Sequence, residues 1–147
     1  MGAYQYNIMT MISISFWPII VAALVAFAIG ALWYSPILFG KEWMSLTRMS
    51  ESDVSAAREK GVAKLYIGQF IVSVVTFGVL GFFIAATGAM TAGDGAFIAF
   101  LAWLGFPLMS GIGDMFWQKK PFKLFLITAV GTLISWIIGG AIIGAWR

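Results

Sequence analysis

Asp114 is the residue best placed for chemistry in this 147-residue chain, because it is the only acidic side chain inside an otherwise apolar segment of helical length. An ionisable group at the centre of a membrane-spanning helix costs about 2.5 to 3.5 kcal/mol on insertion scales, so it needs a partner or water. Asp114 lies five residues before Lys119, roughly 7.5 Å along a helix, so its carboxylate can reach the membrane interface. There it can pair with Lys119, Lys123 or Lys64, and we expect Lys123, at the start of the next helix, to be the partner.

Gln69, Tyr34 and Ser35 are predicted at the same membrane level as Asp114. Together with Lys123, these residues could line a polar pocket open to the cytoplasm. Two interpretations of the pocket stay open at this point. The Asp114 carboxylate either forms an ion pair that fixes the third helix, or it contributes to a site for a ligand or an ion.

Pro107 lies on the same helical face as Asp114, with Ser110 between them at steps of three and four residues. Because proline has no backbone N–H, it leaves the carbonyl of Trp103 available for another partner. Trp103 and Trp136 are the two tryptophans that we expect at mid-membrane depth, on antiparallel neighbouring helices.

Histidine and cysteine are both absent from the sequence. Their absence excludes disulfides, thiolate nucleophiles, histidine-ligated zinc or haem, and the commonest general base of neutral-pH catalysis. A single aspartate supplies neither paired carboxylates nor a nucleophile with its base. We therefore expect no enzymatic activity, no catalytic residue, no metal and no cofactor. The net charge of +3 is too small and too dispersed for a nucleic-acid partner.

The elements that must position these residues are membrane-spanning helices. Hydrophobic residues make up 61% of the chain and charged residues only 10%, against roughly 25% charged in soluble domains. Gaps between charges leave four stretches long enough to span a membrane, which takes about 20 apolar residues. The sequence predicts an all-α polytopic membrane protein, a single domain over residues 1–147, with four helices in an antiparallel bundle near 15–35, 66–88, 96–117 and 122–146. Residues 8–15 either extend the first helix or lie along the interface.

The segment of residues 41–64 is polar and nearly balanced in charge, with five basic and four acidic side chains. Ser50 followed by Asp53 resembles a helix N-cap, and Gly61 can end the same helix. This pattern predicts a short solvated helix in a cytoplasmic loop, and a structural linker is favoured over a docking site.

Basic residues in the short loops indicate the orientation of the bundle, because Lys and Arg near helix ends resist translocation. Eight basic residues fall in the first and third loops, and only Arg147 falls on the other side. We expect a multi-pass protein of the cell membrane, in the cytoplasmic membrane of a bacterium, with both termini outside the cytoplasm. Its first partner is the lipid bilayer.

Small residues recur at helical spacing and predict close helix packing, on which association in lipid depends. One stripe lies on the first helix and two lie on the fourth. A bundle within one chain needs only one of the two faces of the fourth helix, so the Gly140 and Gly144 face favours an outward partner, a second copy or a larger membrane complex. The predicted packing residues are Ala22, Ala26, Gly30, Gly131, Ser135, Gly139, Gly140 and Gly144.

Pro36 disfavours helical geometry at the preceding residue, so the first helix should end or kink there. It belongs to the motif WYSPILFG at residues 33–40, which is followed by Lys41 and Trp43. With residues 103–106 and 120–127, this motif resembles the domain of unknown function 1761 family, which are small four-helix membrane proteins. The resemblance spans nearly the whole chain, and it implies the architecture while leaving the function open. Many relatives carry asparagine where this chain has Gly113, Asp114 and Thr128, so a role carried by those asparagines does not transfer.

The sequence leaves two functional classes for a non-enzymatic membrane protein. The favoured one is an accessory or scaffolding subunit that packs against other membrane helices or against itself, since that role requires no chemistry. The alternative is an oligomeric small-solute or ion transporter or channel with a cytoplasm-facing polar site near Asp114. Only scattered Ser and Thr occur in the outer halves of the four helices, which argues against a pore within one chain.

Overall fold

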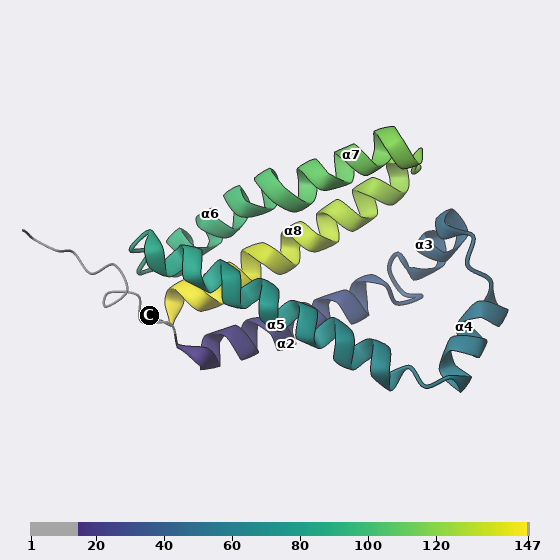
Figure 1. Cartoon of the computed structure of the whole chain (residues 1–147), viewed down its shortest axis with the longest axis horizontal. Coiled ribbons are helices and arrows are strands. Elements are labelled where there is room, and N and C mark those ends of the chain that lie inside the picture. The colour runs from purple at the N-terminus through teal and green to yellow at the C-terminus, as the bar shows by residue number, and fades with distance from the viewer. Residues whose placement is uncertain (1–14, 147) are drawn as a thin grey trace, which may run out of the picture.

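Four apolar helical spans dominate the computed structural model, which describes residues 15–146 (Figure 1). Three of the spans are single helices: α2 (Phe16–Trp33), α5 (Ala63–Ala86) and α8 (Phe122–Ala145). The remaining span, Ala92–Gln118, consists of α6 (Ala92–Trp103), a π-helical turn η1 (Leu104–Leu108) and α7 (Met109–Gln118). Two short helices, α3 (Gly40–Thr47) and α4 (Glu51–Glu59), connect α2 to α5. The chain is therefore an all-helical bundle with four candidate membrane spans.

Short polar side chains determine where two of the helices begin. The Ser50 hydroxyl accepts a hydrogen bond from the Asp53 N–H, and the Asp53 carboxylate accepts one from the Ser50 N–H at 2.9 Å. Thr91 and Asp94 form the same reciprocal pair at the start of α6. Both pairs satisfy N–H groups that the first turn of a helix leaves without a partner.

The linker contains two helices where the sequence suggested one. Arg48 ends α3 in the left-handed conformation, with φ at 57°, and Ser50 then caps α4. The sequence pattern missed α3 because its start has no side-chain cap. Gly40, its first residue, lies so close to the backbone of Tyr34 and Ser35 that a Cβ would clash with it. Glycine is therefore required for the chain to turn back after Pro36.

The buried core lies at one end of the bundle, which we call the terminal end, where α2 begins and α8 ends. Phe77, Leu80 and Ile84 of α5 pack there with Ile19 of α2 and Ile143 of α8. At the opposite end, called the loop end, α3 and α4 and the turn from α7 to α8 are found. Figure 1 shows α2 and α5 diverging from α6, α7 and α8 toward the loop end. The bundle is thus tightly packed at one end and splayed at the other.

The Gly140 and Gly144 face of α8 is covered by α6 of the same chain, so the expected outward partner for this face is wrong. A Cβ on Gly140 would clash with Gly95 and Ala99, and one on Gly144 would clash with the carbonyl of Thr91. The helix needs two close-packing faces because it contacts α6 on one side and both α2 and α5 on the other. The sequence argument assumed that a bundle within one chain would use a single face.

The other face of α8 carries Gly131 and Gly139. Trp33 of α2 lies over Gly131, and Phe77 of α5 lies over Gly139, so closely that a Cβ at either glycine would clash with the ring. Ala22 is fully buried, and Ala26 packs against the core. These predicted packing residues therefore bring helices together within the chain. Gly30 differs, because no atom lies within 4 Å of its ideal Cβ position.

Candidate functional site

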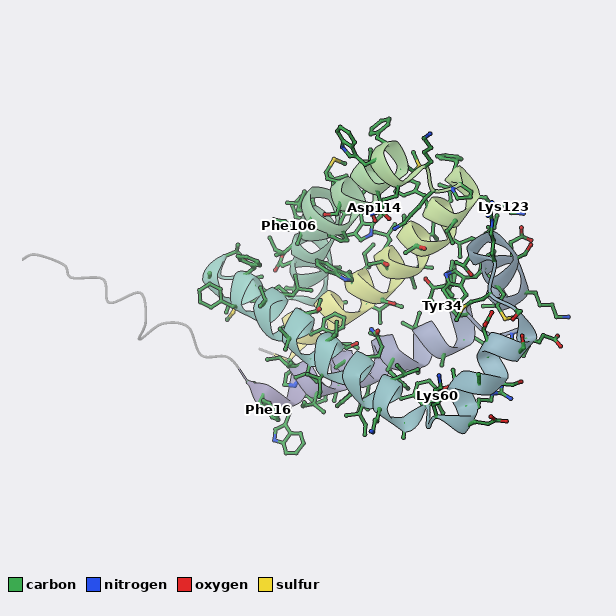
Figure 2. The ribbon with its side chains drawn as sticks, turned by 45° about the vertical axis from the view of Figure 1, so that its right-hand side comes forward. Phe16, Tyr34, Lys60, Phe106, Asp114 and Lys123 are labelled. Atoms are coloured by element: carbon green, nitrogen blue, oxygen red, sulfur yellow. The ribbon has the colours of Figure 1, made fainter. Side chains whose placement is uncertain are left out.

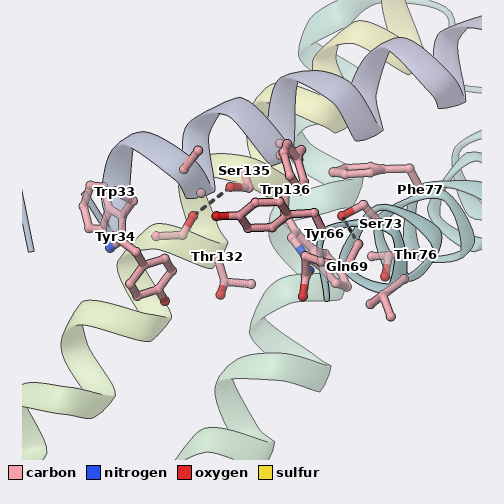
Figure 3. A pocket seen from close by; sticks show the side chains of 16 residues that line it. Trp33, Tyr34, Tyr66, Gln69, Ser73, Thr76, Phe77, Thr132, Ser135 and Trp136 are labelled. Carbon is pink, nitrogen blue, oxygen red and sulfur yellow. Dashed lines mark hydrogen bonds between the residues drawn. The ribbon is translucent and has the colours of Figure 1, made fainter. Parts of the chain in front are cut away.

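A cavity of about 810 Å³ lies between α2, α5 and α8, in the part of the bundle that splays toward the loop end (Figure 3). Its volume falls in the range of roughly 300 to 1,000 Å³ that is typical of small-molecule sites. Its walls are largely apolar, and the open space beside Gly30 is part of it. The lining residues that the argument uses are Gly30, Tyr34, Tyr66, Gln69, Thr132 and Ser135.

Several hydroxyl groups that line this cavity donate hydrogen bonds to backbone carbonyls. Ser73 donates to the Gln69 carbonyl at 3.0 Å, Ser135 donates to the Gly131 carbonyl at 3.0 Å, and Thr132 donates to the Thr128 carbonyl at 2.8 Å. The oxygens of these hydroxyls keep lone pairs that can still accept hydrogen bonds. The cavity therefore presents acceptors to anything that enters it.

Tyr66 and Gln69 supply the complementary groups. Figure 3 shows both side chains at the cavity, on α5, facing Thr132 and Ser135 of α8. Within residues 15–146, no hydrogen bond engages the Gln69 side-chain amide, which is both a donor and an acceptor. The Tyr66 ring is held by an edge-to-face contact with Phe27 of α2, with ring centroids 5.9 Å apart.

Trp33 and Tyr34 form the wall of the cavity at the loop end. The Trp33 indole donates from Nε1 to the Ile127 carbonyl at 3.0 Å, which joins α2 to α8. Partial burial raises the pKa of the Tyr34 phenol, against the opposing effect of its hydrogen bond with Thr128, so the phenol stays protonated at neutral pH. No charged side chain from residues 15–146 lines this cavity.

A second cavity of about 320 Å³ lies on the other side of α8, against η1, α7 and α3. Asp114 and Lys120 line it, together with Trp103, Pro107 and the hydroxyls of Thr47, Thr128 and Thr132. Thr132 lines both cavities, so α8 separates them.

Asp114 pairs with Lys120, at 2.7 Å between Oδ2 and Nζ, so the expected pairing with Lys123 is wrong. Gln118 adds a hydrogen bond from Nε2 to Oδ1 at 2.9 Å. Lys119 ends α7 in the left-handed conformation, with φ at 52°, and the chain reverses so that Lys120 returns to Asp114. Lys123, the second residue of α8 and labelled in Figure 2, pairs instead with Glu42 of α3, at 2.8 Å between Nζ and Oε1.

The five residues of the predicted polar site do not form one site in the structure. Tyr34 and Gln69 line the larger cavity, whereas Asp114 lines the smaller one. The Ser35 hydroxyl donates to the Leu32 carbonyl at 2.7 Å and lines neither cavity, and Lys123 lines neither. Within residues 15–146, no group of three acidic side chains lies close enough to hold a metal ion.

Tyr66, Thr132 and Trp103 are site residues that the sequence analysis did not assign. Thr132 follows Thr128 at a spacing of four, a signal that places two hydroxyls on one helical face. The part that Tyr66 plays in a cavity depends on how far α5 diverges from α8.

Comparison with known proteins gives a family but no relative of known activity. Neither the curated proteins nor the solved structures contain a match to the chain. The family model described as protein of unknown function (DUF1761) matches residues 17–144, which includes all four spans. The motif at residues 33–40 lies where α2 ends and the chain turns back into α3, so the residues that carried the resemblance also shape the loop end of the larger cavity. The chain, with its four candidate membrane spans, belongs to the DUF1761 family of proteins of unknown function.

Proposed function

We propose that this protein is a non-enzymatic membrane protein that binds a neutral, hydrogen-bonding solute in the cavity between α2, α5 and α8, as a small-solute transporter. The observation that carries the proposal is the cavity of about 810 Å³, which combines apolar walls with the free amide of Gln69 and the hydroxyl acceptors of Ser73, Thr132 and Ser135. Such a combination is typical of sites that orient a ligand by a few polar groups.

The uncharged lining favours a neutral solute over an ion. Moving an ion from water into an apolar cavity requires a countercharge or several coordinating groups. Asp114 with Lys120 and Lys123 with Glu42 form ion pairs at the loop end, and none of these four side chains lines the cavity. We therefore place the substrate among uncharged molecules that both donate and accept hydrogen bonds, such as polyols or amides.

The shape of the bundle supports a transport cycle. The cavity lies in the splayed half, and the buried core of Phe77, Leu80 and Ile84 closes the terminal end. A carrier that opens its site to one side while a packed region closes the other has this arrangement. We propose that the loop end faces the cytoplasm, on the basis of the eight basic residues there, and that the described state is open inward.

The accessory or scaffolding role, alone or in an oligomer, stays a prediction. It was favoured because it requires no chemistry, and its supporting argument from the second small-residue face of α8 no longer applies, since α6 occupies that face. The transporter proposal rests on a cavity that one chain forms by itself.

The test begins with binding. Protein in lipid nanodiscs is screened by thermal shift against polyols, amides and their charged analogues, and each stabilising compound is then assayed for counterflow in proteoliposomes. Gly30→Leu is expected to abolish both responses, because the new side chain occupies the cavity. Gly68→Leu is the matched control. Gly68, in α5, is also a helical glycine with open space around its Cβ position, but it does not line the cavity.

The proposal is supported if a neutral compound gives saturable binding and counterflow that Gly30→Leu removes and Gly68→Leu retains. Responses that survive Gly30→Leu place binding elsewhere and contradict the proposal. Binding without counterflow would assign the cavity to a solute-binding subunit and reject transport.

A further inference from the structure

We propose, on the basis of the transport function proposed above, that the solute of the larger cavity is a linear polyol and that Gln69 and Thr76 select its length. The cavity has polar groups in two rows that run along the helix axes, one on α5 and one on α8. A solute that matches both rows is itself extended and carries hydroxyl groups along its whole length.

The row on α5 consists of Tyr66, Gln69, Ser73 and Thr76. These residues follow one another at steps of three, four and three, so they share one face of the helix, and all four line the cavity. At a rise of 1.5 Å per residue, the distance along the axis from Gln69 to Thr76 is about 10.5 Å. A compact ring contacts only part of such a row, whereas an extended chain can contact all of it.

The row on α8 consists of Thr132 and Ser135, which line the cavity opposite α5 (Figure 3). The two helices are in contact at the terminal end, where the ideal Cβ position of Gly81 is 3.7 Å from the side chain of Ile143. Ser73 lies eight residues before Gly81 in α5. Ser135 lies eight residues before Ile143 in α8, which runs in the same direction. The two serines therefore lie at a similar depth, and a solute between the helices meets hydroxyls on both sides.

The middle of the two rows only accepts hydrogen bonds. The Ser73 and Ser135 hydroxyls donate to backbone carbonyls at 3.0 Å, and the Thr132 hydroxyl does so at 2.8 Å, so their remaining lone pairs are acceptors. The solute must therefore donate at these positions. Each hydroxyl of a polyol can donate there and still accept a hydrogen bond from a neighbouring group.

Thr76 and Gln69 flank Ser73 and can donate as well as accept. A threonine within a helix commonly donates to the carbonyl three or four residues earlier. In the described part of the chain, however, no hydrogen bond engages the half-buried Thr76 hydroxyl, which lines the cavity. The Gln69 amide is free in the same way. A simple amide is too short to contact Gln69 and Thr76 together, whereas mannitol, a hexitol, has hydroxyls at both of its ends.

Phe77 limits how far the solute can extend. It directly follows Thr76, it is only 2% exposed, and its ring lies over Gly139 of α8. The α5 row therefore stops at Thr76 on the side of the terminal end. A longer solute gains contacts only toward Gln69 and Tyr66, so its length determines how many groups it binds.

The experiment compares solutes that differ in length and shape. Protein in nanodiscs is titrated calorimetrically with glycerol, erythritol, xylitol and mannitol, and with acetamide and the cyclic polyol myo-inositol. We expect the affinity to rise along the linear series. Mannitol should bind about tenfold or more tightly than glycerol and myo-inositol, because it gains hydrogen bonds at both ends of the row.

Two variants test the residues that select the length. Thr76→Val keeps the shape and removes the hydroxyl, and Gln69→Met removes the amide. Each is expected to weaken mannitol binding about threefold to tenfold and to reduce the preference for mannitol over erythritol. Thr87→Val is the matched control, because Thr87 ends the same helix and lines neither cavity, so the affinity should not change. A general loss of folding would weaken all solutes equally and leave the preference unchanged.

The outcomes separate this inference from the proposed function. Equal binding of myo-inositol or acetamide and mannitol, all abolished by Gly30→Leu, would retain the transport site and reject the linear polyol. Binding of no neutral compound, or binding that survives Gly30→Leu, would reject both. An unchanged preference for mannitol over erythritol in both Thr76→Val and Gln69→Met would overturn the role assigned to these residues.

Discussion

Trp33 and Ile127 are 94 positions apart in the chain, and the indole Nε1 of the first donates to the carbonyl of the second at 3.0 Å. The bond is formed because Gly131, one turn after Ile127, leaves room for the indole against the backbone of α8. It connects α2 to α8 in the splayed half of the bundle, where the larger cavity lies. The bond and the glycine together set the spacing of the two helices.

Trp33→Phe is expected to lower the free energy of unfolding by about 0.5 to 1.5 kcal/mol, because it removes the donor and keeps most of the ring. Gly131→Leu is expected to cost more, because a side chain there clashes with the Trp33 ring. Thermal unfolding in detergent measures both changes. If Trp33→Phe and Gly131→Leu were as stable as the parent protein, this contact would not hold α2 against α8.

Gly140→Leu combined with Gly144→Leu is expected to prevent folding rather than to dissociate an oligomer. The added atoms meet the backbone of Thr91 and Gly95, which cannot rotate away as a side chain can. Size-exclusion chromatography and protease resistance measure the outcome, with Gly68→Leu as the control. A well-folded double variant with a smaller complex mass would show that this face contacts another chain.

Asp114→Asn is expected to lower the free energy of unfolding by less than about 1 kcal/mol, because the Asp114 and Lys120 side chains are 42% and 40% exposed and such pairs contribute little. Asp114→Lys should be partly restored by Lys120→Asp and not by Lys123→Asp. Thermal unfolding of the double variants distinguishes the two lysines. Rescue by Lys123→Asp alone would contradict the observed pairing.

The orientation can be tested because the chain has no cysteine. Ser52→Cys on α4 is expected to stay unlabelled by a membrane-impermeant reagent in intact cells and to react after lysis. Met90→Cys, exposed at the terminal end, is the control that should react in intact cells. Labelling of Ser52→Cys but not of Met90→Cys in intact cells would show that the bundle has the opposite orientation.

The cap of α4 should be sensitive to pH. Hydrogen bonds from the Ser50 side chain and backbone lower the pKa of Asp53, so the ionised carboxylate is favoured in the folded helix. The stabilisation is complete above the usual range of an aspartate and is lost as the pH falls through the lowered pKa. Amide hydrogen exchange in α4 should speed up over that acidic interval, and Asp53→Asn should remove the dependence.

The four spans could be predicted because charged side chains are excluded from lipid, so gaps between charges outline helices without knowledge of their neighbours. The N-cap at Ser50 depends only on neighbouring residues, so it could be predicted as well. The partner of Asp114 could not be predicted, because it depends on the left-handed backbone conformation of Lys119. Lys119 is not a glycine, so the sequence gives no signal for that conformation.

The sequence predicted Tyr34 and Gln69 at a polar pocket, but it did not predict that Thr132 would join them in a cavity separate from Asp114. Tyr34, Gln69 and Thr132 belong to three helices, and they line one space only because the bundle splays toward the loop end. That divergence results from the sum of many packing contacts, including the two close-packing faces of α8. No single sequence motif therefore predicts this divergence of the helices.

The π-helical turn before α7 sets a rotational register for the third span. Such a turn accommodates one residue more than an α-helix of the same rise, and each residue of an α-helix turns the next by about 100°. Deleting Gly105 should therefore convert the turn to regular α-helix and leave α7 at nearly the same rotation relative to α6. Deleting Gly113 from the regular helix α7 should instead rotate Asp114 by about 100° away from the cavity that it lines with Trp103, so the turn is the place where this span can lose a residue and still present both ends to the same cavity.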